Sequence, residues 1–339
     1  MNPDSYYDGS GYDRETVAFY DVAHEGAQVR AVAGAVDALS GLYGMNPRSV
    51  VVLATDQVAH ASARFVNAVR SPLRLPLVIT DTLPGYVGPL DVVIVVGDRA
   101  DAPDVSRALI TADRRGAVTV LVGPARGPIL DDAPAATITI PALPTVLGAS
   151  PARAITAVGT VLDLLEEDTE FVTSRLEEIA QVLDEELEQL SPERDSMVNP
   201  GRQLREFADG ARLTHTGRPG IGFAVADLVA DLWTLKGIPS GAADLAELAA
   251  GAMSAPAAPP RDDIFHDPFL DGPGALLPLK TVVWAQEPEG PDAADTIPHA
   301  LAVTCDTPGV GPATGALKLI TRGLAAATYD LPDPPVEDY

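Results

Sequence analysis

The chain has 339 residues, a length that suggests two domains or one large one. Hydrophobic residues make up 46% of it and aromatic residues only 5%, so the core must consist mostly of Ala, Val, Leu and Ile. The formal net charge of −25 disfavours nonspecific binding to nucleic acid and to anionic membranes. It also disfavours an anionic small molecule, unless local cations or backbone amides offset the field.

Cysteine and histidine usage narrows the chemistry. The single cysteine, Cys305, excludes an intramolecular disulfide and a cysteine-based zinc site. The five histidines lack metal-ligand spacing, and no glycine-rich motif for a dinucleotide or a nucleoside triphosphate is present. The sequence shows no signal peptide and no apolar run long enough to span a membrane. We therefore expect a cytoplasmic protein that needs neither a metal nor a cofactor.

The first half of the chain alternates between strand and helix patterns. Residues 1–14 are polar and predict a mobile arm, and the spacing of apolar residues predicts one helix over 15–43. A second helix is expected over 61–69, and a third around 105–112 with Asp104 as its cap. Strands are predicted at 49–54, 77–80, 91–96, 118–122 and 137–140. This order predicts a mainly parallel sheet covered by helices.

The second half predicts a helical stretch and then another α/β unit. Ser150-Pro151 is a typical helix start, and 169–190 is amphipathic with an acidic face expected in solvent. Strands are predicted at 212–216, 280–285 and 301–305, helices at 222–235 and 313–325, and a long loop at 254–274. We therefore predict an α/β protein of two lobes, each a mainly parallel sheet flanked by helices. The predicted divisions are an arm (1–14), an N-terminal lobe (15–150), a helical connector (151–196) and a C-terminal lobe (197–339).

Four short segments carry a resemblance to a known family. They occur in the family's order over roughly residues 45–339: Leu83-Pro84-Gly85-Tyr86-Val87-Gly88 before a strand, Asn199-Pro200 with Arg202 and Leu204, Ala224-Val225-Ala226, and Asp333-Pro334-Pro335-Val336. Together they resemble the bacterial and archaeal bifunctional phosphoglucose/phosphomannose isomerases, which are two-lobed sugar isomerase (SIS) domain proteins.

The resemblance implies reversible aldose–ketose isomerisation of a sugar phosphate in mannose and glucose phosphate metabolism. It also implies binding of a carbohydrate derivative and a homodimer. Such chemistry moves a proton between adjacent carbons through a carboxylate or a histidine. It also needs a pocket for a dianionic phosphate, built from hydroxyls and from backbone amides at a helix N-terminus.

The sequence departs from the family where the chemistry would lie. The first loop, 54–60, contains no glycine, and the second loop has Asp98, Asp101 and Asp104 where the family has hydroxyls that hold the phosphate. Leu235 stands at the family's catalytic glutamate position. The segment 242–253 contains no histidine, and the catalytic lysine near the C-terminus has no counterpart. We therefore expect lost or altered catalysis, with the catalytic residues unknown.

The candidate site residues follow the first strand of each lobe and the third strand of the first. They are expected to bind substrate: Thr55, His60, Asp98, Arg99, Thr216, Gly217 and Arg218. The last three should face the interlobe cleft, because α/β folds bind ligands beyond the carboxyl ends of their strands. Plainer interpretations are a surface side chain for His60, a salt bridge for Arg99 and an ordinary turn for 216–218. The acidic run 262–267 lacks the spacing of a calcium or zinc site.

Three functions fit these patterns. The first is an active phosphosugar isomerase, and the second is a catalytically silent relative that binds a sugar phosphate or a related molecule, or regulates a partner. The third is the same fold with a site adapted to a neutral or cationic ligand, which the aspartates of the second loop would suit. The missing catalytic groups favour the second.

Overall fold

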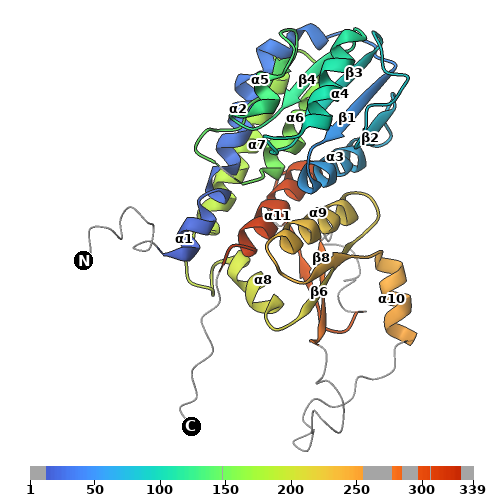
Figure 1. The fold of residues 1–339 in the computed structure, drawn as a ribbon. Helices are drawn as coiled ribbons and strands as arrows, with labels where there is room; N and C mark the ends of the chain where they lie inside the picture. The colour runs from blue at the N-terminus through green and yellow to red at the C-terminus, as the bar shows by residue number, and fades with distance from the viewer. Residues whose placement is uncertain (1–12, 147, 255–276, 285–296, 306, 330–339) are drawn as a thin grey trace, which may run out of the picture.

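The computed structural model describes residues 13–146, 148–254, 277–284, 297–305 and 307–329. Their strands form two parallel sheets, with the orders β2-β1-β3-β4-β5 and β7-β6-β8-β9. Helices flank both sheets, and helices also join the two lobes at the waist of the molecule (Figure 1). This confirms the predicted α/β class with two parallel sheets.

The first sheet is built from five strands, and the two central ones are entirely buried. Its strands are β1 (Ser49–Ala54), β2 (Leu77–Thr80), β3 (Asp91–Val96), β4 (Val118–Val122) and β5 (Ile138–Thr139). Burial on both faces explains the nearly unbroken valine runs that identified β1 and β3 in the sequence. Ala54 pairs with Val96, so the loops that follow these two strands leave the sheet side by side.

The helices of this lobe are α3 (Gln57–Arg70), α4 (Pro103–Arg114), the short α5 (Pro128–Asp131) and α6 (Pro151–Asp163). The predicted Asp104 cap of α4 is wrong. The helix begins two residues earlier than that cap implies, at Pro103, and its N-cap, Ala102, makes no side-chain hydrogen bond. Proline suits the first helical position because its missing N–H would have no partner there. Asp104 lies in the first turn and pairs with Arg107.

The single helix predicted over 15–43 is also wrong. The segment divides into α1 (Arg14–Phe19), the 3₁₀ turn η2 (Val22–His24), α2 (Glu25–Gly34) and the 3₁₀ helix η3 (Val36–Leu42). In η3 the buried residues Val36, Leu39 and Leu42 recur every third position. That spacing matches the three residues per turn of a 3₁₀ helix, so tighter winding keeps all three side chains in the core.

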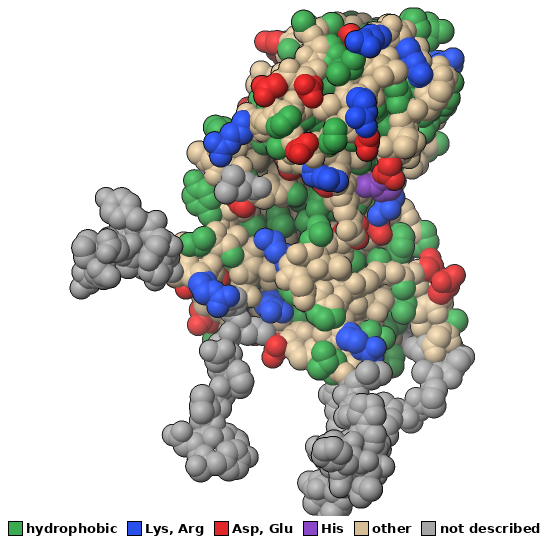
Figure 2. Space-filling view, viewed as in Figure 1, with side chains coloured by type: hydrophobic (Ala, Val, Ile, Leu, Met, Phe, Trp, Pro, Cys, Tyr) green, Lys and Arg blue, Asp and Glu red, His purple; other side chains and the backbone are tan. Residues whose placement is uncertain are grey.

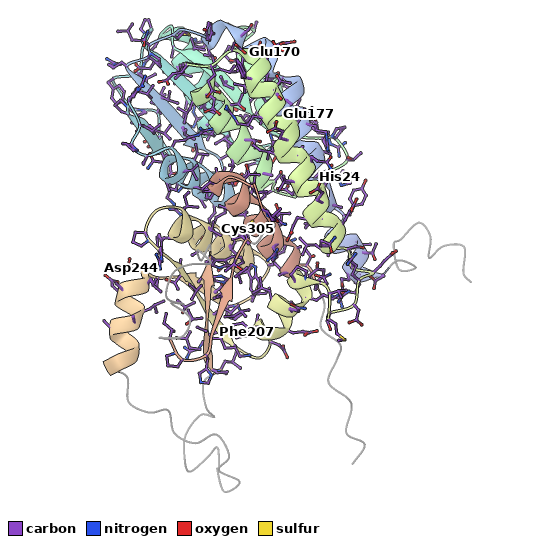
Figure 3. The ribbon with its side chains drawn as sticks, turned by 180° about the vertical axis from the view of Figure 1, so that it is seen from behind. His24, Glu170, Glu177, Phe207, Asp244 and Cys305 are labelled. Atoms are coloured by element: carbon purple, nitrogen blue, oxygen red, sulfur yellow. The ribbon has the colours of Figure 1, made fainter. Side chains whose placement is uncertain are left out.

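The long helix α7 (Thr169–Gln189) packs against α2 and α11 (Pro312–Ala326). Figure 3 shows Glu170 and Glu177 along it, and both are exposed, as expected for its acidic face. Glu186 is an exception that the pattern did not reveal. It is 1% exposed and pairs with Lys318 at 3.1 Å and Arg322 at 2.7 Å. These ion pairs fasten α7 to α11.

The second sheet comprises β6 (Arg212–Gly217), β7 (Ser240–Ala242), β8 (Leu279–Trp284) and β9 (Ala300–Val303). Its helices are α8 (Pro200–Ala208), α9 (Ile221–Leu235), α10 (Leu245–Ser254) and α11. The elements α5, α8, α10 and β7 were not predicted, because they are short or their apolar spacing is weak. His215 lies in the core of this lobe between Trp233 and Trp284, whose Nε1–H donates to His215 Nδ1 at 2.9 Å.

The lobes meet through α3 and α9, which run antiparallel. Gln57, at the start of α3, contacts Asp231, whereas Arg64, two turns later, contacts Asp227, one turn earlier in α9. Because α3 follows β1 and α9 follows β6, the carboxyl ends of these two strands lie at opposite ends of the helix pair. No helix in the described part of the chain is long and apolar enough to cross a membrane.

Candidate functional site

A polar cavity of about 370 Å³ lies at the carboxyl end of β1, where the first lobe meets α9. Of the predicted site residues, Thr55 and His60 line it. The complete lining is Ala54, Thr55, Asp56, Gln57, His60, Arg64, Asp81 and Asp231. Ligands of α/β folds bind in this kind of position, beyond the carboxyl ends of the strands. The cavity is therefore the candidate binding site.

Asp56 is the central residue of this site. One carboxylate oxygen, Oδ1, caps α3 by accepting the N–H of Ala59 at 2.9 Å. The other, Oδ2, accepts the N–H of Asp98 at 2.8 Å and the hydroxyl of Thr55 at 3.0 Å. Donors from a helix N-terminus and from a neighbouring loop are the groups with which proteins hold phosphate. Here a carboxylate of the chain itself uses them.

Gly97 makes this arrangement possible. Its φ of +137° is unusual for any other residue, and an added Cβ would lie 2.0 Å from Thr55 Oγ1 and 2.4 Å from Asp56 Oδ2. The first loop does lack glycine, as the sequence indicated. The glycine that permits close approach stands instead in the second loop, and what it approaches is Asp56.

Asp98 does not face a ligand as expected but is held beneath the loop. It pairs with Arg153 of α6, a side chain that is 1% exposed and that also donates to the carbonyls of Gly123 at 3.0 Å and Ile140 at 3.4 Å. Burial raises the pKa of Asp98, and the guanidinium of Arg153 opposes that rise. The carboxylate of Asp98 is therefore engaged by Arg153, and it is not among the residues that line the cavity.

The other charges of the second loop also lie outside the cavity. Arg99 is exposed and donates through Nη1 to the carbonyl of Thr55 at 3.5 Å, a contact at the limit of a hydrogen bond. Within the described residues it forms no ion pair, in contrast to the salt bridge considered from the sequence. Asp101 and Asp104 are exposed. The second loop thus positions Asp56 through Gly97 and the backbone of Asp98, and its side chains do not line the cavity.

The cavity lining is acidic. Asp56, Asp81 and Asp231 contribute three carboxylates, against a single guanidinium from Arg64. That guanidinium is itself 2.6 Å from Asp227 and 3.6 Å from Asp231. Burial raises the pKa of Asp231, and its Oδ1 accepts a hydrogen bond from Gln57 Nε2 at 2.6 Å, which lowers the pKa again. A dianion entering here would meet carboxylates and no unpaired cation of the lining.

Thr216, Gly217 and Arg218 do not line this cavity. Thr216 is buried and donates its hydroxyl to the carbonyl of Ala243 at 2.8 Å. A Cβ on Gly217 would lie 2.4 Å from the backbone of Gly222, so this glycine permits β6 and the first turn of α9 to touch. Arg218 is exposed. The antiparallel packing of α3 and α9 puts all three at the far end of the helix pair.

Six of the eight lining residues were not predicted from the sequence: Ala54, Asp56, Gln57, Arg64, Asp81 and Asp231. Asp56 had a usable signal, because an aspartate just before a helix is a typical N-cap. Asp81 also had a signal, because it directly follows β2, which pairs in parallel with β1. Asp231 had none, since only the packing of α9 against α3 brings it to the end of β1. Leu235, at the family's glutamate position, is 57% exposed and lies one turn beyond Asp231.

The possibility of metal binding was also raised by the sequence. Across the described part of the chain, no cluster of three or more His, Cys, Asp or Glu side chains has a geometry suited to a metal ion. The acidic run 262–267 lies outside the described residues.

Solved structures show what the fold is similar to. The E. coli tagatose-6-phosphate ketose/aldose isomerase matches with a TM-score of 0.62 and 11% identity, over 94% of this chain and 93% of its own. The C-terminal domain of glucosamine-fructose-6-phosphate aminotransferase from Francisella tularensis matches with a TM-score of 0.58 and 12% identity, over 94% and 97%. No protein-family model matches the chain, and no curated protein matches its sequence.

These matches extend over both lobes, so the chain shares the two-lobed α/β fold of these solved structures. The predicted fold is confirmed at that level. The bifunctional phosphoglucose/phosphomannose isomerase family is a finer assignment that depends on the sequence segments alone. At these identities the structural likeness describes the fold and leaves the ligand to be argued from the site.

Proposed function

We propose that this protein binds a non-phosphorylated carbohydrate derivative, neutral or cationic, in the cavity at the end of β1, and does not isomerise sugar phosphates. The observation that carries the proposal is the Asp56 carboxylate, which accepts the N–H groups of Ala59 and Asp98. These are the donors that a phosphate would need, and a half-buried carboxylate already bonded to them cannot share them with a second anion without repulsion.

The rest of the lining supports the same ligand class. Carboxylates and the amide of Gln57 are good partners for sugar hydroxyls and for an ammonium group. The cavity is within the usual size range for small-molecule sites. An amino sugar would place its positive charge among Asp56, Asp81 and Asp231. The resemblance to the bifunctional isomerases makes derivatives of glucose and mannose the first compounds to test.

A calorimetric titration of the full chain distinguishes these ligands. Glucosamine and mannosamine are titrated beside glucose, glucose 6-phosphate and mannose 6-phosphate at pH 7. We expect the amino sugars to bind most tightly and the phosphates to show no binding. Tighter binding of either phosphate than of its parent sugar would overturn the proposal. The matched variant is Asp81→Asn, which removes one cavity carboxylate without touching Asp56 and should weaken amino sugars more than glucose.

A second candidate is aldose–ketose isomerisation of a non-phosphorylated sugar, with Asp231 as the proton carrier. It is favoured by the raised pKa of Asp231, which brings a carboxylate closer to the range useful for proton transfer. His60 lines the same cavity. Incubation with glucose or mannose in ²H₂O would reveal deuterium at carbon 2 if this were the function. Loss of that exchange in Asp231→Asn, with sugar binding retained, would support it over simple binding.

We also propose that the chain forms a homodimer in the cytoplasm. The support is the family resemblance described above, together with the lack of an apolar helix of membrane-spanning length in the described residues. Light scattering coupled to size exclusion measures the mass directly. A mass of one chain at micromolar concentration would contradict the dimer.

A further inference from the structure

A second cavity, of about 150 Å³, lies away from the site at β1. It is enclosed by the C-terminal half of α3, the middle of α6, the first half of α7 and the first turns of α11. Its wall is mainly apolar, including Phe65, Val66, Ile155, Val172, Leu176 and Leu317. The waist where the lobes meet shows hydrophobic side chains in a hollow on the face of Figure 2. An apolar cavity of this volume in another protein holds a benzene molecule.

Gly159 keeps the cavity open although glycine lowers the stability of helix α6. It stands in the middle of the buried helix α6, where glycine is less stable than alanine by about 0.5–1 kcal/mol. The backbone does not require it, because its φ is not positive. Nor does packing exclude a larger residue, since an added Cβ would meet only Arg70 Nη2, at 3.9 Å. What Gly159 provides is volume in the cavity.

The cavity also contains polar groups without partners. Thr160 lines it and is 2% exposed, yet its hydroxyl has no hydrogen-bond partner in the described structure. The helix α11 begins at Pro312 with no side-chain cap. The N–H groups of Ala313 and Thr314, both lining residues, lie in its first turn, where a helix leaves its donors free. The buried hydroxyl of Thr160 and the N-terminus of α11 can therefore both donate hydrogen bonds to a ligand.

Two guanidiniums add to this polar end. Arg70 and Arg175 both donate to Asp163 Oδ2, at 2.6 and 2.7 Å, and Arg175 also pairs with Glu167. Each guanidinium has five N–H groups, so donors remain for a further acceptor. Because the two carboxylates balance the two guanidiniums, a bound anion would interact mainly with the partial positive charge of the α11 N-terminus and with these spare donors.

We propose that this cavity is a binding site for a small amphipathic carboxylate, with its apolar body among α3, α6 and α7 and its carboxylate toward the start of α11, Arg70 and Thr160. The site is separate from the cavity at β1 and does not depend on the function proposed there. The ligand class is set by the size of the cavity, by its apolar wall and by the donors of Arg70, Thr160 and the start of α11 that line it.

Hexanoate is the probe, and hexan-1-ol is its uncharged counterpart. In methyl-labelled full-length protein we expect hexanoate to shift the methyl resonances of Val66, Val172 and Leu176 in a saturable manner. We expect the affinity for hexan-1-ol to be lower by about tenfold or more. No shift at any of these methyls at millimolar hexanoate would overturn the proposal. Equal affinity for the alcohol would overturn its carboxylate part.

Two substitutions locate the site. Gly159→Leu should fill the cavity and abolish the shifts, whereas Gly251→Leu, at an exposed helical glycine of α10 with open space around its Cβ, should leave them unchanged. Should Gly159→Leu fail to fold, Arg70→Gln serves instead, and it should weaken hexanoate but not hexan-1-ol. Hexanoate binding unaltered by both substitutions would place the ligand elsewhere and overturn the proposal.

Discussion

Asp56 Oδ2 accepts the backbone N–H of Asp98 at 2.8 Å, so the loop after β1 is joined to the loop after β3 by a carboxylate of the protein. The same side chain begins α3. The negative charge that a substrate phosphate brings to such a position in other proteins is therefore already present, and it is covalently part of the chain. The overall acidity of the sequence matters less than this one carboxylate.

Asp56→Ser should restore a phosphate site. Serine still caps α3, but it leaves the Asp98 N–H free and removes the charge. We expect a loss of about 1–2 kcal/mol in the free energy of unfolding, because charge-assisted hydrogen bonds are lost. We also expect inorganic phosphate to raise the melting temperature of the variant and not that of the wild type. Asp81→Asn is the control, and an equal effect of phosphate on it would point to net charge rather than to Asp56.

Arg153→Met tests the ion pair beneath the second loop. The substitution removes the guanidinium that pairs with Asp98 and that donates to the carbonyls of Gly123 and Ile140, in a region where the arginine is 1% exposed. Removing one partner of a buried pair should cost about 3 kcal/mol, measured by urea unfolding. Asp98→Asn should cost less, because its side chain is 20% exposed. A loss below about 1 kcal/mol for Arg153→Met would contradict a structural role for the pair.

Burial of Glu25 predicts that the free energy of unfolding falls as the pH rises. It is buried against α6, where its Oε2 accepts the Ala152 N–H at 2.8 Å, and burial raises its pKa to about 7. The unfolded chain has the ordinary value of 4.5, so this group's stabilisation is complete below pH 4.5 and is lost as the pH rises through 7. The slope can reach about 1.4 kcal/mol per pH unit. Glu25→Gln should remove it in unfolding measurements between pH 4.5 and 7.

Burial of His215 predicts the opposite change, a free energy of unfolding that falls as the pH falls. Burial lowers its pKa to about 3 from 6.5, so the neutral ring is favoured in the fold. Stability from this group is complete above pH 6.5 and is lost as the pH falls toward 3. His215→Phe should flatten that loss, at a cost of about 1–3 kcal/mol at pH 8, because Trp284 Nε1–H loses its acceptor.

The two buried groups should offset one another between pH 4.5 and 6.5. In Glu25→Gln only His215 remains, so the free energy of unfolding should fall as the pH falls. In His215→Phe only Glu25 remains, so it should rise as the pH falls. Equal pH slopes for both variants and the wild type would show that neither group titrates as its burial implies.

Much of the fold could be predicted because its signals are local. The valine runs of β1 and β3 require burial on both faces, and Ser150-Pro151 is a helix start that needs no distant partner. Thr55 and His60 were predicted for a related reason, since residues just after the first strand of a parallel sheet lie at the edge where such folds bind ligands, and both line the cavity at β1.

The failures come from contacts between residues far apart in the chain. No pattern near position 98 reveals that Arg153 will neutralise Asp98, and none near 231 brings that aspartate to the end of β1. The direction in which α9 packs on α3 decided that Thr216, Gly217 and Arg218 lie away from the cavity. That direction is a property of two packed helix surfaces and not of either helix alone.

The sequence by itself therefore determined the two parallel sheets, Leu235 and the lack of histidine over 242–253, because strand burial and residue identity are local properties. The tertiary structure alone decided which backbone donors the Asp56 carboxylate would occupy. Asp56 reads as a helix cap in the sequence, and it becomes an internal anion only when Gly97 lets the second loop approach it closely. The backbone N–H groups of Ala59 and Asp98 come from two separate loops. Only the packing of β1 beside β3 brings them to the same carboxylate.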